Sequence, residues 1–266
     1  MAACLVACAA GYVGAQTCTV TYTNLNFGTY TGTVVNNTNS ATIKCNGGTW
    51  TLGLNAGTGS GATITDRKLT GPGGAQLNYT LFQDAARTTV WGDTATTEES
   101  GSGNTTQTIY GQVFAGQFAV PGTYTDTVSS VTSSFTVTAT VQATCSISAT
   151  SLAFGTYASV AINSTSTLSV TCTNTTPYNV GLNAGTASGA TVTNRSMTGP
   201  GAAKLGYKLF RDSGRTLNWG NTVGTDTLAG TGTGALQSLT VYGQLTAGQH
   251  VAPGSYADTI TATLTY

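Results

Sequence analysis

The sequence predicts an all-β protein made of two similar β-sandwich domains in tandem. Short runs of alternating apolar and hydroxyl side chains are separated by clusters of Gly, Pro and Asn, which is typical of strands joined by tight turns. No segment keeps a helical 3.6-residue period over a dozen residues. One set of motifs occurs twice in the same order, and 266 residues suffice for two domains of about 100–150 residues each.

The repeated motifs define the two units. Side chains present in both copies are expected to build the scaffold, so we expect Trp91 and Trp219 in the two cores and Arg67 and Arg195 in structural hydrogen bonds. The paired motifs are FGTY at 27–30 and 154–157, LNAG at 54–57 and 182–185, TGPG at 70–73 and 198–201, LF.D at 81–84 and 209–212, YGQ at 110–112 and 242–244, and PG(T/S)Y at 121–124 and 253–256.

Composition and charge exclude several classes of function. Only 7% of the residues are charged while 39% are apolar, which favours a folded chain over a disordered one. The formal net charge is zero and no cluster of Lys or Arg occurs, so we expect no nucleic-acid partner and no patch for anionic membranes.

Residues 1–16 (MAACLVACAAGYVGAQ) predict the end of a secretory signal peptide. An apolar run leads to Val13-Gly14-Ala15, which resembles an A-x-A cleavage site. No positively charged residue precedes it, so we expect the natural start to lie upstream. Leu5–Cys8 also resembles a lipobox, and the alternative is a lipoprotein attached at Cys8. No other segment approaches the roughly 18 apolar residues of a membrane helix.

Four cysteines remain after the predicted cleavage: Cys18, Cys45, Cys145 and Cys172. The spacing within the first pair equals that within the second, which predicts one disulfide in each unit, and export to an oxidising compartment permits both. A zinc site is not expected, because the spacings do not suit one and His250 is the only histidine.

An extended strand is predicted between the two units. Residues 129–134 form a Ser-rich turn, so the segment after it is expected to fold back on the preceding strand, 124–128, as a hairpin partner. Threonines alternate with the apolar residues, which is typical of a strand buried on one side. The buried face is expected to carry Phe135, Val137, Ala139 and Val141.

The second unit has no equivalent of this strand. Its last strand, 256–266, alternates to the end and is followed by no further segment. We therefore expect a first domain at 17–130 that is completed by a linker and donor strand at 131–143. The second domain, 144–266, is expected to lack its final strand.

Together these motifs resemble the spore coat protein U family, whose members are subunits of archaic chaperone–usher pili of bacteria. The resemblance covers residues 17–266 and rests on FGTY after the first cysteine, LNAGT…GAT…R, TGPG…L.Y.LF.D, WG, YGQ and PG(T/S)Y.DT. It implies that each unit is an incomplete immunoglobulin-like sandwich whose missing strand comes from the N-terminal extension of a neighbouring subunit. Residues 135–141, directly ahead of Cys145, match the position of such a donor strand.

The resemblance also implies a place in the fibre. After cleavage the chain would begin Gln16-Thr17-Cys18, with no donor strand of its own, so it is expected to accept a strand but not to give one. This predicts a two-domain tip subunit, exported through the periplasm to the cell surface. The implied partners are a periplasmic chaperone, an outer-membrane usher and the next pilin subunit, which donates a strand to the second domain.

Apolar residues present in the first unit and replaced in the second are candidate contacts with a host or abiotic surface. The strongest is Phe118, which lies in a Pro-containing loop; rings at such a position supply a large contact area. The alternative is that these residues only fill the larger core of the first unit. The four candidates are Phe118, Phe114, Val90 and Trp50.

Two further functions stay open, namely a structural coat or matrix protein of the same fold and a secreted carbohydrate-binding module. Catalysis is not expected, because the lone His250 stands where the other copy has Phe118 and cannot anchor a Ser-His-Asp site. No cofactor and no metal are expected.

Overall fold

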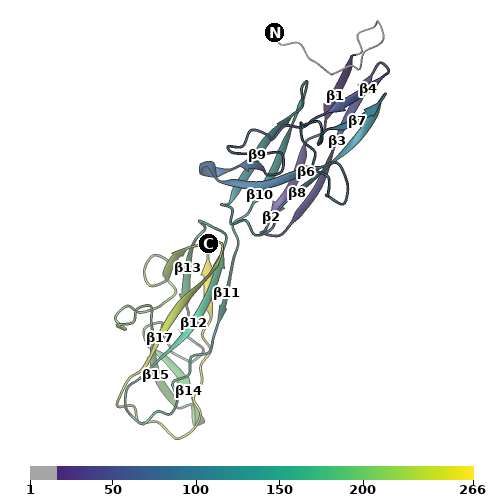
Figure 1. Cartoon of the computed structure of the whole chain (residues 1–266). Coiled ribbons are helices and arrows are strands. Elements are labelled where there is room, and N and C mark those ends of the chain that lie inside the picture. Colours follow the sequence, from purple (N-terminus) through teal and green to yellow (C-terminus); the bar gives the residue numbers. More distant parts are fainter. Residues whose placement is uncertain (1–16) are drawn as a thin grey trace. The chain divides into compact units, whose positions relative to one another are not determined.

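The computed structural model describes residues 17–266 as two compact units, which divide between Gln142 and Ala143. The predicted signal peptide and Cys8 lie outside the described residues. The described chain consists of strands and two 3₁₀ turns, at Pro72–Gly74 and Pro200–Ala202 (Figure 1). Across this part of the chain no helix is long and apolar enough to span a membrane.

Unit 1 contains ten strands. They are β1 Cys18–Tyr22, β2 Leu25–Tyr30, β3 Val35–Cys45, β4 Thr49–Leu52, β5 Arg67–Thr70, β6 Gln76–Phe82, β7 Glu99–Ser102, β8 Thr105–Val113, β9 Gly122–Ser129 and β10 Ser134–Val141.

These strands form the two layers of a sandwich. One layer has the order β1-β3-β8-β6-β5, and a single pair, Thr70 with Thr125, connects β5 to the second group, β9-β10-β2. β4 and β7 pair separately. Side chains alternate between buried and exposed along β8, β9 and β10, as the period-2 pattern of the sequence predicts. Their buried faces enclose one continuous apolar core.

Unit 2 contains eight strands. They are β11 Cys145–Ala149, β12 Ile162–Cys172, β13 Pro177–Leu182, β14 Arg195–Thr198, β15 Lys204–Phe210, β16 Leu228–Thr231, β17 Leu236–Leu245 and β18 Ala262–Thr265.

The first layer of unit 1 recurs in unit 2, but the second layer does not. The order β11-β12-β17-β15-β14 matches β1-β3-β8-β6-β5, and β13 with β16 matches β4 with β7. The repeated motifs place β2 at 152–157 and β9 at 254–261 of unit 2, and neither segment is a regular strand there. The predicted all-β class is confirmed, with two tandem sandwiches of which the second lacks its final strand.

A buried arginine stabilises the same loops in both units. The Arg67 guanidinium donates to the carbonyl oxygens of Leu54 at 2.9 Å and Trp91 at 2.7 Å, and Arg195 makes the matching bonds to Leu182 and Trp219. Burial lowers the pKa of Arg67 to about 10, so the guanidinium remains charged near neutral pH. The sequence-based prediction of a structural role agrees with these bonds.

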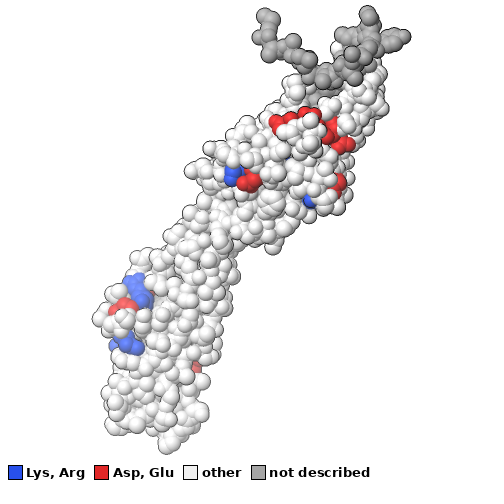
Figure 2. Space-filling view, viewed as in Figure 1, with Lys and Arg blue, Asp and Glu red and all other residues white. Residues whose placement is uncertain are grey.

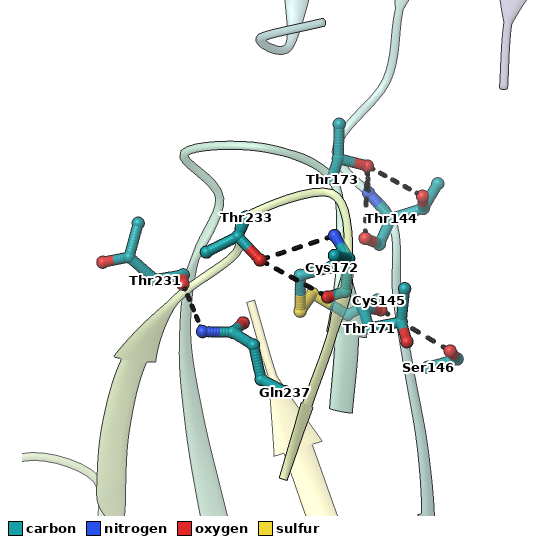
Figure 3. Close-up of a disulfide and its surroundings, with 10 residues drawn as sticks. Thr144, Cys145, Ser146, Thr171, Cys172, Thr173, Thr231, Thr233 and Gln237 are labelled. Carbon is teal, nitrogen blue, oxygen red and sulfur yellow. Dashed lines mark hydrogen bonds between the residues drawn. A yellow bond between two sulfur atoms is a disulfide. The ribbon is translucent and has the colours of Figure 1, made fainter. Parts of the chain in front are cut away.

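One disulfide closes the edge of each unit, joining Cys18 to Cys45 and Cys145 to Cys172. In unit 2 the flanking residues Thr144 and Thr173 bond to each other through both backbone and side chain, as Figure 3 shows. Each disulfide links directly opposed residues of two antiparallel strands, so it fixes the register of an edge strand.

Candidate functional site: an unfilled groove in unit 2

In unit 1, β10 fills the space between β9 and β2. All eight of its residues pair antiparallel with β9, and its other edge pairs in parallel with β2, from Leu25 opposite Val137 to Tyr30 opposite Val141. The four apolar side chains expected on its buried face are at most 4% exposed: Phe135, Val137, Ala139 and Val141. β10 therefore completes both the backbone pairing and the core of unit 1.

The corresponding space in unit 2 is an open groove of about 1060 Å³. Its two walls are the segments 152–157 and 254–261, which are the counterparts of β2 and β9. Without a strand between them they lack the ladder that makes β2 and β9 regular, and one isolated bridge, Thr198 with Ala257, ties the second wall to β14. The groove lies at the position that β10 fills in unit 1.

The walls expose apolar side chains whose counterparts in unit 1 are buried. Leu25 and Tyr124 are 0% exposed, whereas the matching Leu152 and Tyr256 are only partly buried. The same difference holds for Phe154, Tyr157 and Ile260 against Phe27, Tyr30 and Val128. Because backbone and apolar groups are both left uncovered, the groove favours pairing with an added strand.

A fixed carboxylate, that of Asp258, lines the groove. Asp258 accepts hydrogen bonds from the Thr186 backbone and hydroxyl, both at 2.8 Å, and from the Tyr207 hydroxyl at 2.7 Å. Partial burial raises the pKa of Asp258, but these bonds outweigh it and hold the pKa below its usual range. Gly185, at φ 86°, is required there because a side chain would collide with this carboxylate.

The counterpart in unit 1 shows what a seated strand does to this carboxylate. Asp126 makes the same bonds to Thr58 and Tyr79 but is only 3% exposed, because Val137 of β10 lies directly opposite it. Sequence reasoning missed this pair of networks. The aspartate of the PG(T/S)Y.DT motif, present in both copies, was the signal that could have found it.

Comparison with known proteins identifies the family. The model of the Spore Coat Protein U domain matches residues 5–130 and again residues 131–263, which together cover most of the chain. The chain belongs to the spore coat protein U family. The second match begins at residue 131, so the family model assigns the β10 segment to the second spore coat protein U domain, whereas the structure folds it into the first.

A relative of known sequence and a solved structure are similar to this chain. Protein U of Myxococcus xanthus is 37% identical over 128 residues, which are 43% of this chain and 71% of that protein. A chain in the CsuC–CsuE chaperone–tip adhesion subunit pre-assembly complex, from archaic chaperone–usher Csu pili of Acinetobacter baumannii, has a TM-score of 0.55. It is 20% identical, with 94% of this chain and 100% of that chain covered, and it supports the fold.

The four candidate contact residues do not form one surface. Trp50 is 3% exposed and lies in the core, with its ring against Gly101, so it cannot contact a surface and that interpretation is corrected. Phe114 and Val90 are half-buried at the ends of pairing segments. Phe118 alone of the four is strongly exposed, at 63%.

Phe118 lies at the end of unit 1 where β10 ends. The Tyr30 hydroxyl donates to the Phe114 carbonyl oxygen and accepts from the Gln117 backbone, both at 2.9 Å, and Tyr30 pairs with Val141 at the end of β10. The Phe118 loop therefore lies beside the point where the chain leaves unit 1. Tyr30 thus ties the loop to the last residue of β10.

Among the described residues no group of three or more His, Cys, Asp or Glu side chains could hold a metal ion. The chemistry that the groove offers is backbone pairing and apolar burial around one fixed carboxylate.

Proposed function

We propose that this chain is an adhesive tip subunit of a bacterial surface pilus assembled by strand donation. The observation that carries the proposal is the contrast between the two domains: β10 fills the groove of unit 1, and the matching groove of unit 2 is open. By sequence β10 belongs to the second domain, but in the structure it completes the first. A donor strand has the same relation to two pilin subunits, because it belongs to one and completes the other.

Unit 2 is then the end that joins the fibre. A periplasmic chaperone would cover its groove first, and the N-terminal strand of the next pilin would replace the chaperone at an outer-membrane usher. The fold shared with a chain of a chaperone–tip adhesion subunit complex supports the chaperone as a partner. The protein would be exported through the periplasm to the cell surface, with residues 1–16 as its signal peptide, 131–143 as an internal linker and donor strand, and unit 1 as the adhesive domain.

Self-complementation tests the strand acceptor. The chain is extended after Tyr266 by a flexible linker and a copy of residues 134–142. Because β18 continues along β13, Tyr266 lies five residues beyond the end of the segment 254–261. The linker must span that length, roughly 17 Å, in the opposite direction before the added strand can enter the groove. About ten Gly and Ser residues suffice for this. We expect a soluble monomer in which amides of 152–157 and 254–261 become protected from exchange. The control carries Asp at the position that copies Val137 and should leave the amides of 152–157 and 254–261 as unprotected as they are in the unextended chain.

The place in the fibre needs a separate test. Intact pili labelled with an antibody against unit 1 should show label only at fibre ends in electron micrographs. Label along the whole fibre would instead support the structural coat or matrix protein. In the self-complementation test, protection of 152–157 and 254–261 in the unextended chain would contradict strand donation itself.

A further inference from the structure

The two domains differ at a second place, the edge of the small sheet. In unit 2, β18 pairs antiparallel with β13, with Leu264 opposite Val180 and Thr263 opposite Gly181, and it also contacts β11. β13 therefore has a partner on both edges, since β16 pairs with its other side.

In unit 1 the chain leaves this path. After Ser129 it turns, with the Ser130 backbone N–H donating to the Ser133 carbonyl oxygen at 2.8 Å, and continues as β10. β4, the counterpart of β13, pairs with β7 on one edge, and no strand of the described chain pairs with the other edge. The edge faces a cleft of about 60 Å³ that is lined by residues of β1, β3 and β4, by Gly53 and by the turn at 130–132.

The backbone groups of Thr51 and Gly53 point to this open edge. Along a strand, successive residues direct their N–H and C=O groups to opposite edges. The Leu54 N–H donates to the Gly92 carbonyl oxygen on the β7 side, and the Asn55 N–H donates to Ser129 on the other side, both at 2.9 Å. Thr51 and Gly53 lie four and two positions before Asn55, so their N–H and C=O groups point to the same edge as the Asn55 N–H. Their counterparts Asn179 and Gly181 pair with β18.

Trp50 also lines this cleft. Its side chain is 3% exposed, and the buried indole N–H has no hydrogen-bond partner among the described residues. The counterpart in unit 2 is Tyr178. The cleft volume is far below the roughly 300–1,000 Å³ of a small-molecule site, so the cleft suits one inserted side chain of an added strand rather than a whole ligand.

The charge beside the open edge is negative. Asp93 and Glu98 lie over Gly53, on the face where a side chain of that residue would point. Figure 2 shows acidic side chains gathered on unit 1. Gly181 faces Asn221 instead. A side chain placed opposite Gly53 would therefore lie on the face that holds Asp93 and Glu98.

We propose that the open edge of β4 is a second strand-acceptor site, which binds an extended segment of another protein antiparallel to β4. The segment places an apolar side chain opposite Leu52, as Leu264 lies opposite Val180, and a Lys or Arg opposite Gly53, beside Asp93 and Glu98.

The position suits contact with a target. The site lies at the start of β10, and the chain leaves unit 1 at the other end of that strand. Val131, 76% exposed, borders the cleft. The inference goes beyond the proposed function, because it concerns unit 1 and requires no donor strand in unit 2.

Amide hydrogen exchange of the full chain, read by NMR at single residues, tests the site. The probe is a synthetic peptide with the sequence of Thr261–Tyr266 in which Thr263 is replaced by Lys. We expect it to slow exchange at Thr51 and Gly53 by at least about tenfold at saturation, while Asn179 and Gly181, already paired with β18, do not change. A matched peptide with Asp in place of that Lys should bind about fivefold or more weakly.

A variant of the chain tests the charge preference. Asp93→Asn combined with Glu98→Gln should reduce the difference between the Lys and Asp peptides to about twofold or less. An unchanged difference would overturn the assignment of a basic residue opposite Gly53.

Two other outcomes would overturn the site. If Thr51 and Gly53 are protected as strongly as Asn179 and Gly181 before any peptide is added, a segment of the chain itself occupies the edge. If the peptide slows exchange only at 152–157 and 254–261, it binds the unfilled groove alone. In that case strand donation to unit 2 would stand while the site on β4 would not.

Discussion

Placing a charge on the buried face of β10 should unfold unit 1, and Val137→Asp is the sharpest form of this test. Val137 is 0% exposed and lies opposite both Asp126 and Leu25. Loss of its burial costs about 1.5–3 kcal/mol. The new carboxylate would also face the Asp126 carboxylate, whose oxygens already accept bonds from Thr58 and Tyr79, so a buried charge without a partner adds about 3 kcal/mol or more.

The sum, about 5 kcal/mol or more, is comparable with the whole stability of a typical domain, about 5–15 kcal/mol. The assay is urea unfolding of the full chain, together with a separate measurement of amide exchange in β2 and β9, which bond to β10. The control is Thr140→Asp, which adds the same charge to the exposed face of the same strand and should change stability by no more than about 0.5 kcal/mol. If both variants unfold at the same urea concentration, β10 does not complete unit 1 and the reasoning fails.

Three further predictions follow from the same structure. Replacing Cys18 and Cys45 by Ser should cost unit 1 about 3–4 kcal/mol of unfolding free energy in the chain-entropy model, measured by urea titration; an unchanged midpoint would contradict it. The pKa of Asp258 is lower in the folded state, so its contribution to stability is complete above the unfolded pKa of about 4 and is lost as the pH falls through the folded value. The melting temperature of unit 2 should therefore fall less steeply with decreasing pH in Asp258→Asn than in the unchanged chain. Phe118→Ser should change stability by no more than about 0.5 kcal/mol in thermal unfolding, because Phe118 is exposed. Adhesion to an apolar surface should also be unchanged, because Phe118 lies at the linker end of unit 1. A loss of adhesion would show that the Phe118 loop is part of the contact surface.

Much of the fold could be predicted because the sequence presents its pattern twice. Alternating Phe135 and Val137 predicted a strand with one buried face, and the Ser-rich turn before it predicted a hairpin with the preceding strand; β10 pairs with β9 in that way. Equal cysteine spacing predicted the pairs that form the two disulfides. These features depend on local pattern and short loops, so one chain suffices to read them.

The environment of single side chains could not be predicted in the same way. Trp50 differs between the copies, which suggested a contact residue, but a difference between copies says nothing about burial. Phe118 has the loop composition of an exposed residue and is exposed, yet its end of the domain depends on the bond between Tyr30 and Gln117, which are far apart in the sequence. The open edge of β4 could not be predicted either, because the edge stays open only if the chain turns after Ser129 instead of continuing along β4.

The structure also limits which strand unit 2 can accept. In unit 1, Ala139 lies opposite Tyr124, whose ring is held between Gly71, where any side chain would collide with it, and the Val120 carbonyl oxygen, to which its hydroxyl donates at 2.8 Å. A ring fixed on both sides cannot move for a larger neighbour, so the third buried position of the donor must be small.

Tyr256 is held in the same way, by Gly199 and by a 2.8 Å bond to the Ala252 carbonyl oxygen, before any strand is present. The size requirement is thus built into the empty groove and does not depend on the strand that enters it. A donor for unit 2 should accordingly repeat the order of β10, with large or branched side chains at the first, second and fourth buried positions and Ala or Gly at the third. Strands that alternate apolar and polar residues but carry Leu or Phe at the third position should be rejected, so size at one position distinguishes the correct partner from other alternating segments.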